Sequence, residues 1–81
     1  MTEALQEKAL QERWGLSPRQ AKVAMALAAG RSYKEIAEDL GITFHTVNTH
    51  VKAVLAKTGA KTSRRLAAMI HEGLNGDRPY L

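Results

Sequence analysis

Apolar residues recur at helical spacing along most of the chain, and no stretch alternates as a strand would. The spacing predicts helices near residues 17–29, 32–40, 43–58 and 63–73, with an additional helix near 3–13. The expected fold class is therefore all-α. The chain has 81 residues, which suits one small domain.

Short polar signals mark where the helices begin. Ser17 and Ser32 stand before apolar runs, with Gln20 and Glu35 three residues later, which is the pattern of a capping box. The predicted caps are Ser17, Ser32, Thr43 and either Thr62 or Ser63. Pro18 fits the first helical position after its cap.

The segment from Tyr33 to Val51, YKEIAEDLGITFHTVNTHV, predicts two short helices joined by a tight turn. Ala37 is small where the helices must approach, and Gly41 stands where the turn needs a left-handed residue. A positive φ is expected at Gly41. This is the helix-turn-helix arrangement, in which the second helix enters the major groove of DNA.

The second helix of this pair divides into two faces. Its apolar residues fall on one side at about 100° per residue; they are Val47, Val51, Val54 and Leu55. Asn48, Thr49 and Lys52 fall on the other side, with His45 near them. This outer face can form hydrogen bonds and carries no acid, as a surface that meets base edges and phosphates requires.

The first segment has a thinner apolar pattern, and two interpretations of it stay open. Residues 1–16 are either the end of a linker to an upstream domain or a packed extra helix, and residues 17–81 form the DNA-binding domain. Trp14 is expected to pack on the core. The net charge is −1 over residues 1–16 and +5 over residues 17–81, so the basic part is the helix-turn-helix part.

Several classes of function are disfavoured by what the chain lacks. It has no cysteine, which excludes a disulfide scaffold and a cysteine-ligated zinc site. No apolar run approaches the length of a membrane span and no signal peptide is evident, so the cytoplasm is the expected location. His45 and His50 are five residues apart, the wrong spacing for two ligands on one helical face. We expect no enzyme activity, no metal and no cofactor.

The motifs together resemble the LuxR/FixJ-type (GerE-like) helix-turn-helix domain of bacterial transcription regulators. The resemblance runs through LSPRQ at 16–20, GRSYKEIAEDLGIT at 30–43, HTVNTHVKAVLAKTGA at 45–60 and SRRLAAM at 63–69. It implies a four-helix domain without a wing, here with an additional N-terminal helix. It also implies binding to promoter DNA, commonly as a dimer on inverted half-sites.

The resemblance assigns roles to individual positions. Asn48, Thr49 and Lys52 occupy the base-facing positions of the recognition helix. Phosphate contacts are expected from Thr43, Thr46, Lys57, Lys34 and His45. Arg64 and Arg65 fit a DNA contact and a solvated helix start equally well.

Two departures from the family pattern matter most, and a third, Thr58 in place of a leucine, only weakens an apolar contact. Gln20 replaces a glutamate, which keeps the cap but removes the charge and any salt bridge it made. Asn48 replaces a lysine; asparagine can pair with adenine through two hydrogen bonds, whereas lysine prefers guanine or phosphate. The target sequence is therefore expected to differ from that of typical members.

The expected partners are double-stranded DNA and, on DNA, a second copy held weakly through the last helix (63–73). An upstream sensor domain outside this chain is a further possibility that the family implies. Two alternatives remain: a promoter-recognition module of a sigma factor, and a protein-interaction domain that kept the fold without DNA binding. The segment around Ser63 and Arg64 disfavours the first, and the polar face of Asn48, Thr49 and Lys52 disfavours the second.

Overall fold

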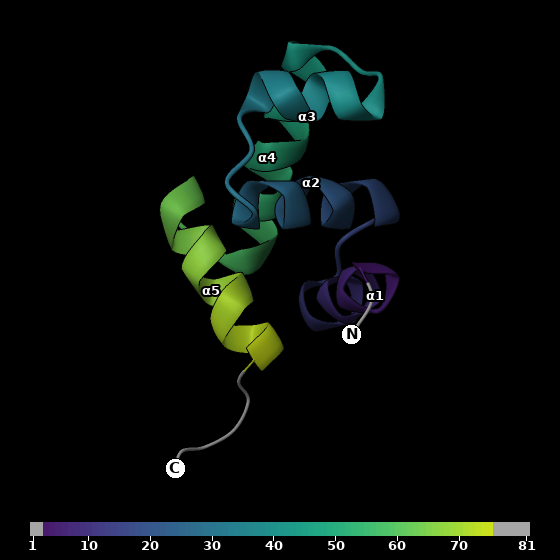
Figure 1. Ribbon diagram of the computed structural model, residues 1–81. Coiled ribbons are helices and arrows are strands. Elements are labelled where there is room, and N and C mark those ends of the chain that lie inside the picture. Colours follow the sequence, from purple (N-terminus) through teal and green to yellow (C-terminus); the bar gives the residue numbers. More distant parts are fainter. Residues whose placement is uncertain (1–2, 76–81) are drawn as a thin grey trace.

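The computed structural model describes residues 3–75, which form five helices and no strand, so the predicted all-α fold is confirmed (Figure 1). The helices are α1 (Glu3–Trp14), α2 (Pro18–Ala28), α3 (Tyr33–Leu40), α4 (Phe44–Thr58) and α5 (Ser63–Asn75). Each predicted helix is present, and its ends agree with the predicted range to within one or two residues.

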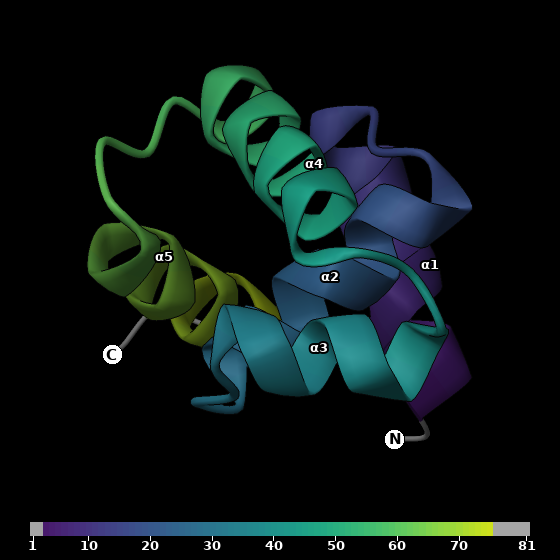
Figure 2. The same cartoon turned by 90° about the horizontal axis from the view of Figure 1, so that it is seen from above.

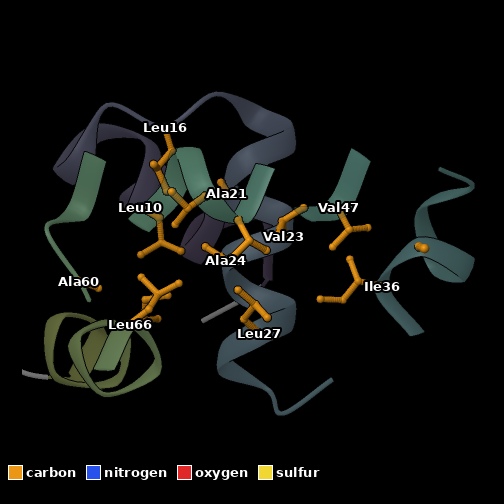
Figure 3. Close-up of a cluster of buried hydrophobic side chains, with 14 residues drawn as sticks. Leu10, Leu16, Ala21, Val23, Ala24, Leu27, Ile36, Val47, Ala60 and Leu66 are labelled. Carbon is orange, nitrogen blue, oxygen red and sulfur yellow. The ribbon is translucent and has the colours of Figure 1, made fainter. Parts of the chain in front are cut away.

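Helix α2 lies at the centre of the molecule and packs against all four other helices (Figures 1 and 2). Its inward side chains are almost fully buried; they are Ala21, Val23, Ala24 and Leu27. Figure 3 shows the core extending to both sides of this helix, with Ile36 and Val47 at one end and Leu10 and Leu66 at the other. The core therefore holds the helix-turn-helix pair and the two outer helices together.

The predicted capping boxes are present at the starts of α2 and α3. The backbone N–H of Gln20 donates to Ser17 Oγ at 3.1 Å, and that of Ser17 donates to Gln20 Oε1 at 3.0 Å. Ser32 and Glu35 make the same reciprocal pair. The bond from the Ser32 backbone lowers the pKa of Glu35 below its ordinary value. This cap therefore stabilises the fold at pH values above the pKa of Glu35 in the unfolded chain. The stabilisation is lost as the pH falls through the lower pKa of Glu35 in the folded protein.

The turn between α3 and α4 has the predicted left-handed geometry. Gly41 has φ 68° and ψ 34°, and its backbone N–H donates to the carbonyl of Ala37. A side chain at this φ would meet its own backbone, which is the reason for glycine. The turn joins α3 to α4, which pack against each other, and Ala37 of α3 is buried in the common core.

Helix α1 packs against α2 and α5. Leu10 is 1% exposed and Leu16 is 5% exposed, and both belong to the common core. Trp14 packs partly buried on that core, as expected. Glu7 pairs with Lys22 of α2 at 3.2 Å. Of the two interpretations left open, the packed extra helix agrees with these contacts, while the domain division at residue 16 stays a prediction.

Helix α5 is capped by Thr62, whose Oγ1 accepts from the backbone N–H of Arg65 at 3.0 Å. This settles the choice between Thr62 and Ser63. The helical spacing of the sequence predicts Leu66, Ile70 and Leu74 on one inward stripe of this helix. Leu66 and Ile70 are buried, as this spacing predicts, and the side chain of Leu74 lies outside the described residues.

Candidate nucleic-acid interface

The start of α4 is shaped by two threonines. The backbone N–H of Thr46 donates to Thr43 Oγ1 at 3.0 Å, which makes Thr43 the N-cap, and the two hydroxyl oxygens lie 2.9 Å apart. The backbone N–H groups of Phe44 and His45 have no acceptor within the helix, because no helical carbonyl precedes the first turn of a helix. The first turn carries no acid. The geometry suits an anion at this end of α4.

The two predicted faces of α4 are present. Val47, Val51 and Val54 are at most 1% exposed and pack inward. Thr49 and Lys52 are exposed, and Asn48 is half-buried at the border of the two faces. The valines therefore hold the predicted base-facing residues toward solvent, along with His45.

Thr49 has one hydrogen-bonding role already taken. Its hydroxyl donates to the backbone carbonyl of His45 at 3.1 Å. The hydroxyl hydrogen is thus used within the helix, in the pattern common for threonine one turn downstream of a carbonyl. What Thr49 presents outward is a methyl group and an oxygen that can still accept.

Lys57, at the other end of α4, makes contacts that the sequence did not indicate. Its Nζ donates to Gln20 Oε1 at 2.9 Å and to the carbonyl of Gly15 at 3.1 Å. Gln20 therefore serves the cap of α2 and holds the last turn of α4 at the same time. The departure from glutamate removes a charge, as expected, but the amide oxygen remains an acceptor for the lysine.

The other predicted phosphate contacts lie on separate elements. Lys34 is exposed in the first turn of α3, and His45 is exposed in the first turn of α4. Arg64 and Arg65 are exposed at the start of α5. Within residues 3–75, no hydrogen bond or ion pair joins Lys34 to α4.

One feature of this surface was missed at the sequence level. Phe44, the first residue of α4, is 59% exposed, and its ring lies 5.7 Å from that of Tyr33, tilted by 43°. The helical pattern gave no sign of it, because at about 100° per residue Phe44 falls between Val51 and Leu55 and is grouped with the inward face.

Other chemistries find no support in residues 3–75. No group of three His, Asp or Glu side chains is gathered as a metal site there. Nor does any helix in that range combine the length and apolar character needed to cross a bilayer.

A short helix, a left-handed turn and a longer helix with a polar, acid-free outer face define a helix-turn-helix DNA-binding domain. Residues 15–70 match the family of bacterial regulatory proteins described as the luxR family, and the chain belongs to that family. It is a DNA-binding domain of the transcription-regulator class, and the family is not one of enzymes.

A relative supports the same class. The chain is 47% identical over 51 residues to the transcriptional regulatory protein MctR of Rhizobium johnstonii. The match covers 63% of this chain and 24% of that protein, so the chain spans about a quarter of the relative's length. No solved structure gives a significant match.

Proposed function

We propose that this chain places α4 in the major groove of double-stranded DNA and reads bases with Asn48, Thr49 and Lys52. The observation that carries the proposal is the division of α4, with buried valines on one side and polar, acid-free residues on the other. A salt-dependent gel shift with the purified chain tests it. Binding that weakens with added salt supports the proposal, and absence of binding favours the protein-interaction alternative.

The three base-facing residues offer different chemistry. Asn48 can donate to and accept from an adenine edge, and Lys52 suits guanine acceptors or a phosphate. Thr49 offers its methyl to thymine, because its hydroxyl hydrogen is bonded to His45. Together they define a mixed sequence preference.

The phosphate contacts follow from the start of α4. Thr43 and Thr46 share one hydrogen bond between their hydroxyls, which uses only one of the two hydroxyl hydrogens. The other hydrogen is left to donate outward. Together with the N–H groups of the first turn, it would hold one phosphate oxygen at the positive end of the helix dipole. His45 and Lys34 would contact the flanking backbone.

Lys57 is proposed as a second phosphate anchor. An ammonium group has three N–H donors, and two of them are directed at Gly15 and Gln20. The third is left for a phosphate oxygen, and the two internal bonds restrict the side chain before DNA arrives. This reduces the entropy lost on binding.

Replacing Lys57 with Ala is expected to weaken binding to all DNA sequences alike. The plot of log affinity against log salt should flatten by about one unit, because one phosphate contact releases about 0.9 counterion. Fluorescence anisotropy titrations at several salt concentrations would measure the slope.

Gln20→Ala is the matched control for this prediction. It removes an internal acceptor of Lys57 but keeps the cation, so the slope should stay that of the wild type. A Lys57→Ala slope equal to the wild-type slope would remove Lys57 from the phosphate contacts and leave it a structural role alone.

We also propose that a second copy binds weakly through α5 when both copies occupy adjacent half-sites. Leu66 and Ile70 are buried in the core, which leaves the flank of Ala67 and Ala68 for a partner. His71 follows on the same helix, but its Nε2 lies 3.1 Å from the carbonyl of Ala28, which holds the ring toward α2. So little apolar surface makes a weak interface that DNA must assist.

Replacing Ala68 with Glu is expected to abolish cooperative binding to an inverted repeat while sparing affinity for one half-site. Two carboxylates would face each other across the two-fold axis, whereas the DNA-facing helix is unchanged. Gel shifts on one-site and two-site DNA would measure both quantities. If Ala68→Glu still binds the inverted repeat cooperatively, α5 is not the interface. A tight wild-type dimer in sedimentation without DNA would likewise exclude a weak interface through α5.

The wider setting of the domain is also a proposal. Regulators of this family act on bacterial promoters, so we place the chain in the cytoplasm with its DNA. The much greater length of the relative leaves room there for a further domain, and we propose a sensor domain upstream of this one. The full open reading frame upstream of Met1 tests this.

A further inference from the structure

Phe44 combines exposure with a defined orientation. Its side chain is 59% exposed, and large exposed hydrophobics are few among the described side chains. The ring of Tyr33 supports it from α3, with 5.7 Å between centroids. Thr43 and Thr46 fix the helical turn on which it stands. An aromatic ring is thus held at the start of the recognition helix with most of its surface uncovered.

The position of Phe44 places it beside the proposed base-reading residues. It stands four residues before Asn48, so the two lie one turn apart along one side of α4. In helix-turn-helix domains the N-terminal residues of the recognition helix contact base edges. The ring therefore extends the proposed reading surface at the end that enters the groove.

The chemistry of the ring selects its partner. Phosphates and most base edges are polar. A phenyl ring that contacts them displaces their water but cannot replace the hydrogen bonds that the water made. The C5-methyl of thymine is the apolar group that the major groove displays, and phenylalanine is one of the side chains suited to it. Cytosine carries only a hydrogen at that C5 position, and an amino group where thymine has O4.

We propose that Phe44 is a specificity-determining residue that packs against the methyl group of a thymine next to the base pair read by Asn48. The inference rests on the proposed assignment of the α4 outer face to the major groove. It adds an apolar reading element to that face, with Tyr33 as the residue that positions it.

The test replaces thymine by uracil, which removes only the methyl group. A binding site is first selected from randomised DNA with the wild-type chain. Each thymine is then changed to uracil in turn, and affinity is measured by fluorescence anisotropy for wild type and Phe44→Ala. Wild type should lose about three- to four-fold at the thymine that meets Phe44, the effect of one buried methyl group, in addition to any loss at the thymine that meets Thr49. Phe44→Ala should bind thymine and uracil equally at that position.

Two variants keep the result interpretable. Leu5→Ala removes a similarly exposed apolar side chain from α1 and should reproduce the wild-type uracil profile. If Phe44→Ala fails to fold, Phe44→Gln takes its place in the test, because glutamine is also a good helix former. This variant too should bind thymine and uracil equally at that position. Circular dichroism would confirm the helical content of each variant.

The outcomes separate this inference from the proposed function. If the wild type selects a motif but its uracil profile matches that of Phe44→Ala at every thymine, the Phe44 contact is excluded and DNA reading by α4 stands. If the wild type selects no motif, the assignment of the outer face is wrong and the Phe44 contact is excluded with it.

Discussion

Replacing Leu10 with Ala is expected to destabilise the whole domain by about 2–5 kcal/mol. Leu10 is 1% exposed and lies in the same core as the residues of α2 and α5. The truncation removes buried methyl groups and leaves a cavity where α1 meets its neighbours. Because the total stability of a small domain is about 5–15 kcal/mol, this is a large share of it. Urea unfolding followed by circular dichroism would measure the loss.

Leu5→Ala is the control on the same helix. Leu5 is 57% exposed, so its truncation should change the unfolding free energy by no more than about 0.5 kcal/mol. If the unfolding free energy of Leu10→Ala also stays within that margin of the wild-type value, α1 does not contribute to the stability of the fold in solution. Residues 1–16 would then be a linker, the other interpretation of the sequence.

Replacing Asn48 with Ala is expected to weaken binding to the selected site by about 1–3 kcal/mol and to relax preference at one base position. The amide can make two hydrogen bonds to an adenine edge, and alanine can make none. Non-specific binding should change little, because the phosphate contacts remain. Replacing Asn48 with Lys should move the preference toward guanine.

A binding selection on randomised DNA with the wild type and both variants measures this directly. The wild type should return adenine at one position, Asn48→Lys guanine, and Asn48→Ala no preference there. One common motif from all three proteins would show that Asn48 reads no base and that the face assigned to the groove is wrong. The half-buried position of Asn48, at the border of the two faces, makes this the sharpest test of the assignment.

The elements of the fold could be predicted because their signals are local. A serine cap and the residue three places later stand within one turn, and the left-handed turn needs glycine at a single position. The observed caps of α2, α3 and α4, and the positive φ of Gly41, follow from these short-range rules. The family could be predicted as well, because the motifs that define it lie on these same helices and turns.

What escaped prediction depends on contacts between distant residues. Lys57 meets Gly15 and Gln20 across 42 and 37 positions of sequence, and nothing near Lys57 indicates those acceptors. The packing of α1 depends mainly on Leu10. One buried leucine is too few to define an apolar face by periodicity. The exposure of Phe44 depends on how α4 leaves the turn beside Tyr33.

The central position of α2 has a consequence for genetics. Ala21, Val23 and Ala24 are fully buried in the helix that contacts every other, yet none of the proposed DNA contacts lies on it. Substitutions there act through the folded fraction of the protein, which falls with heating. A mutant screen should therefore recover temperature-sensitive alleles in α2. Defects that persist at every growth temperature should come from the outer face of α4.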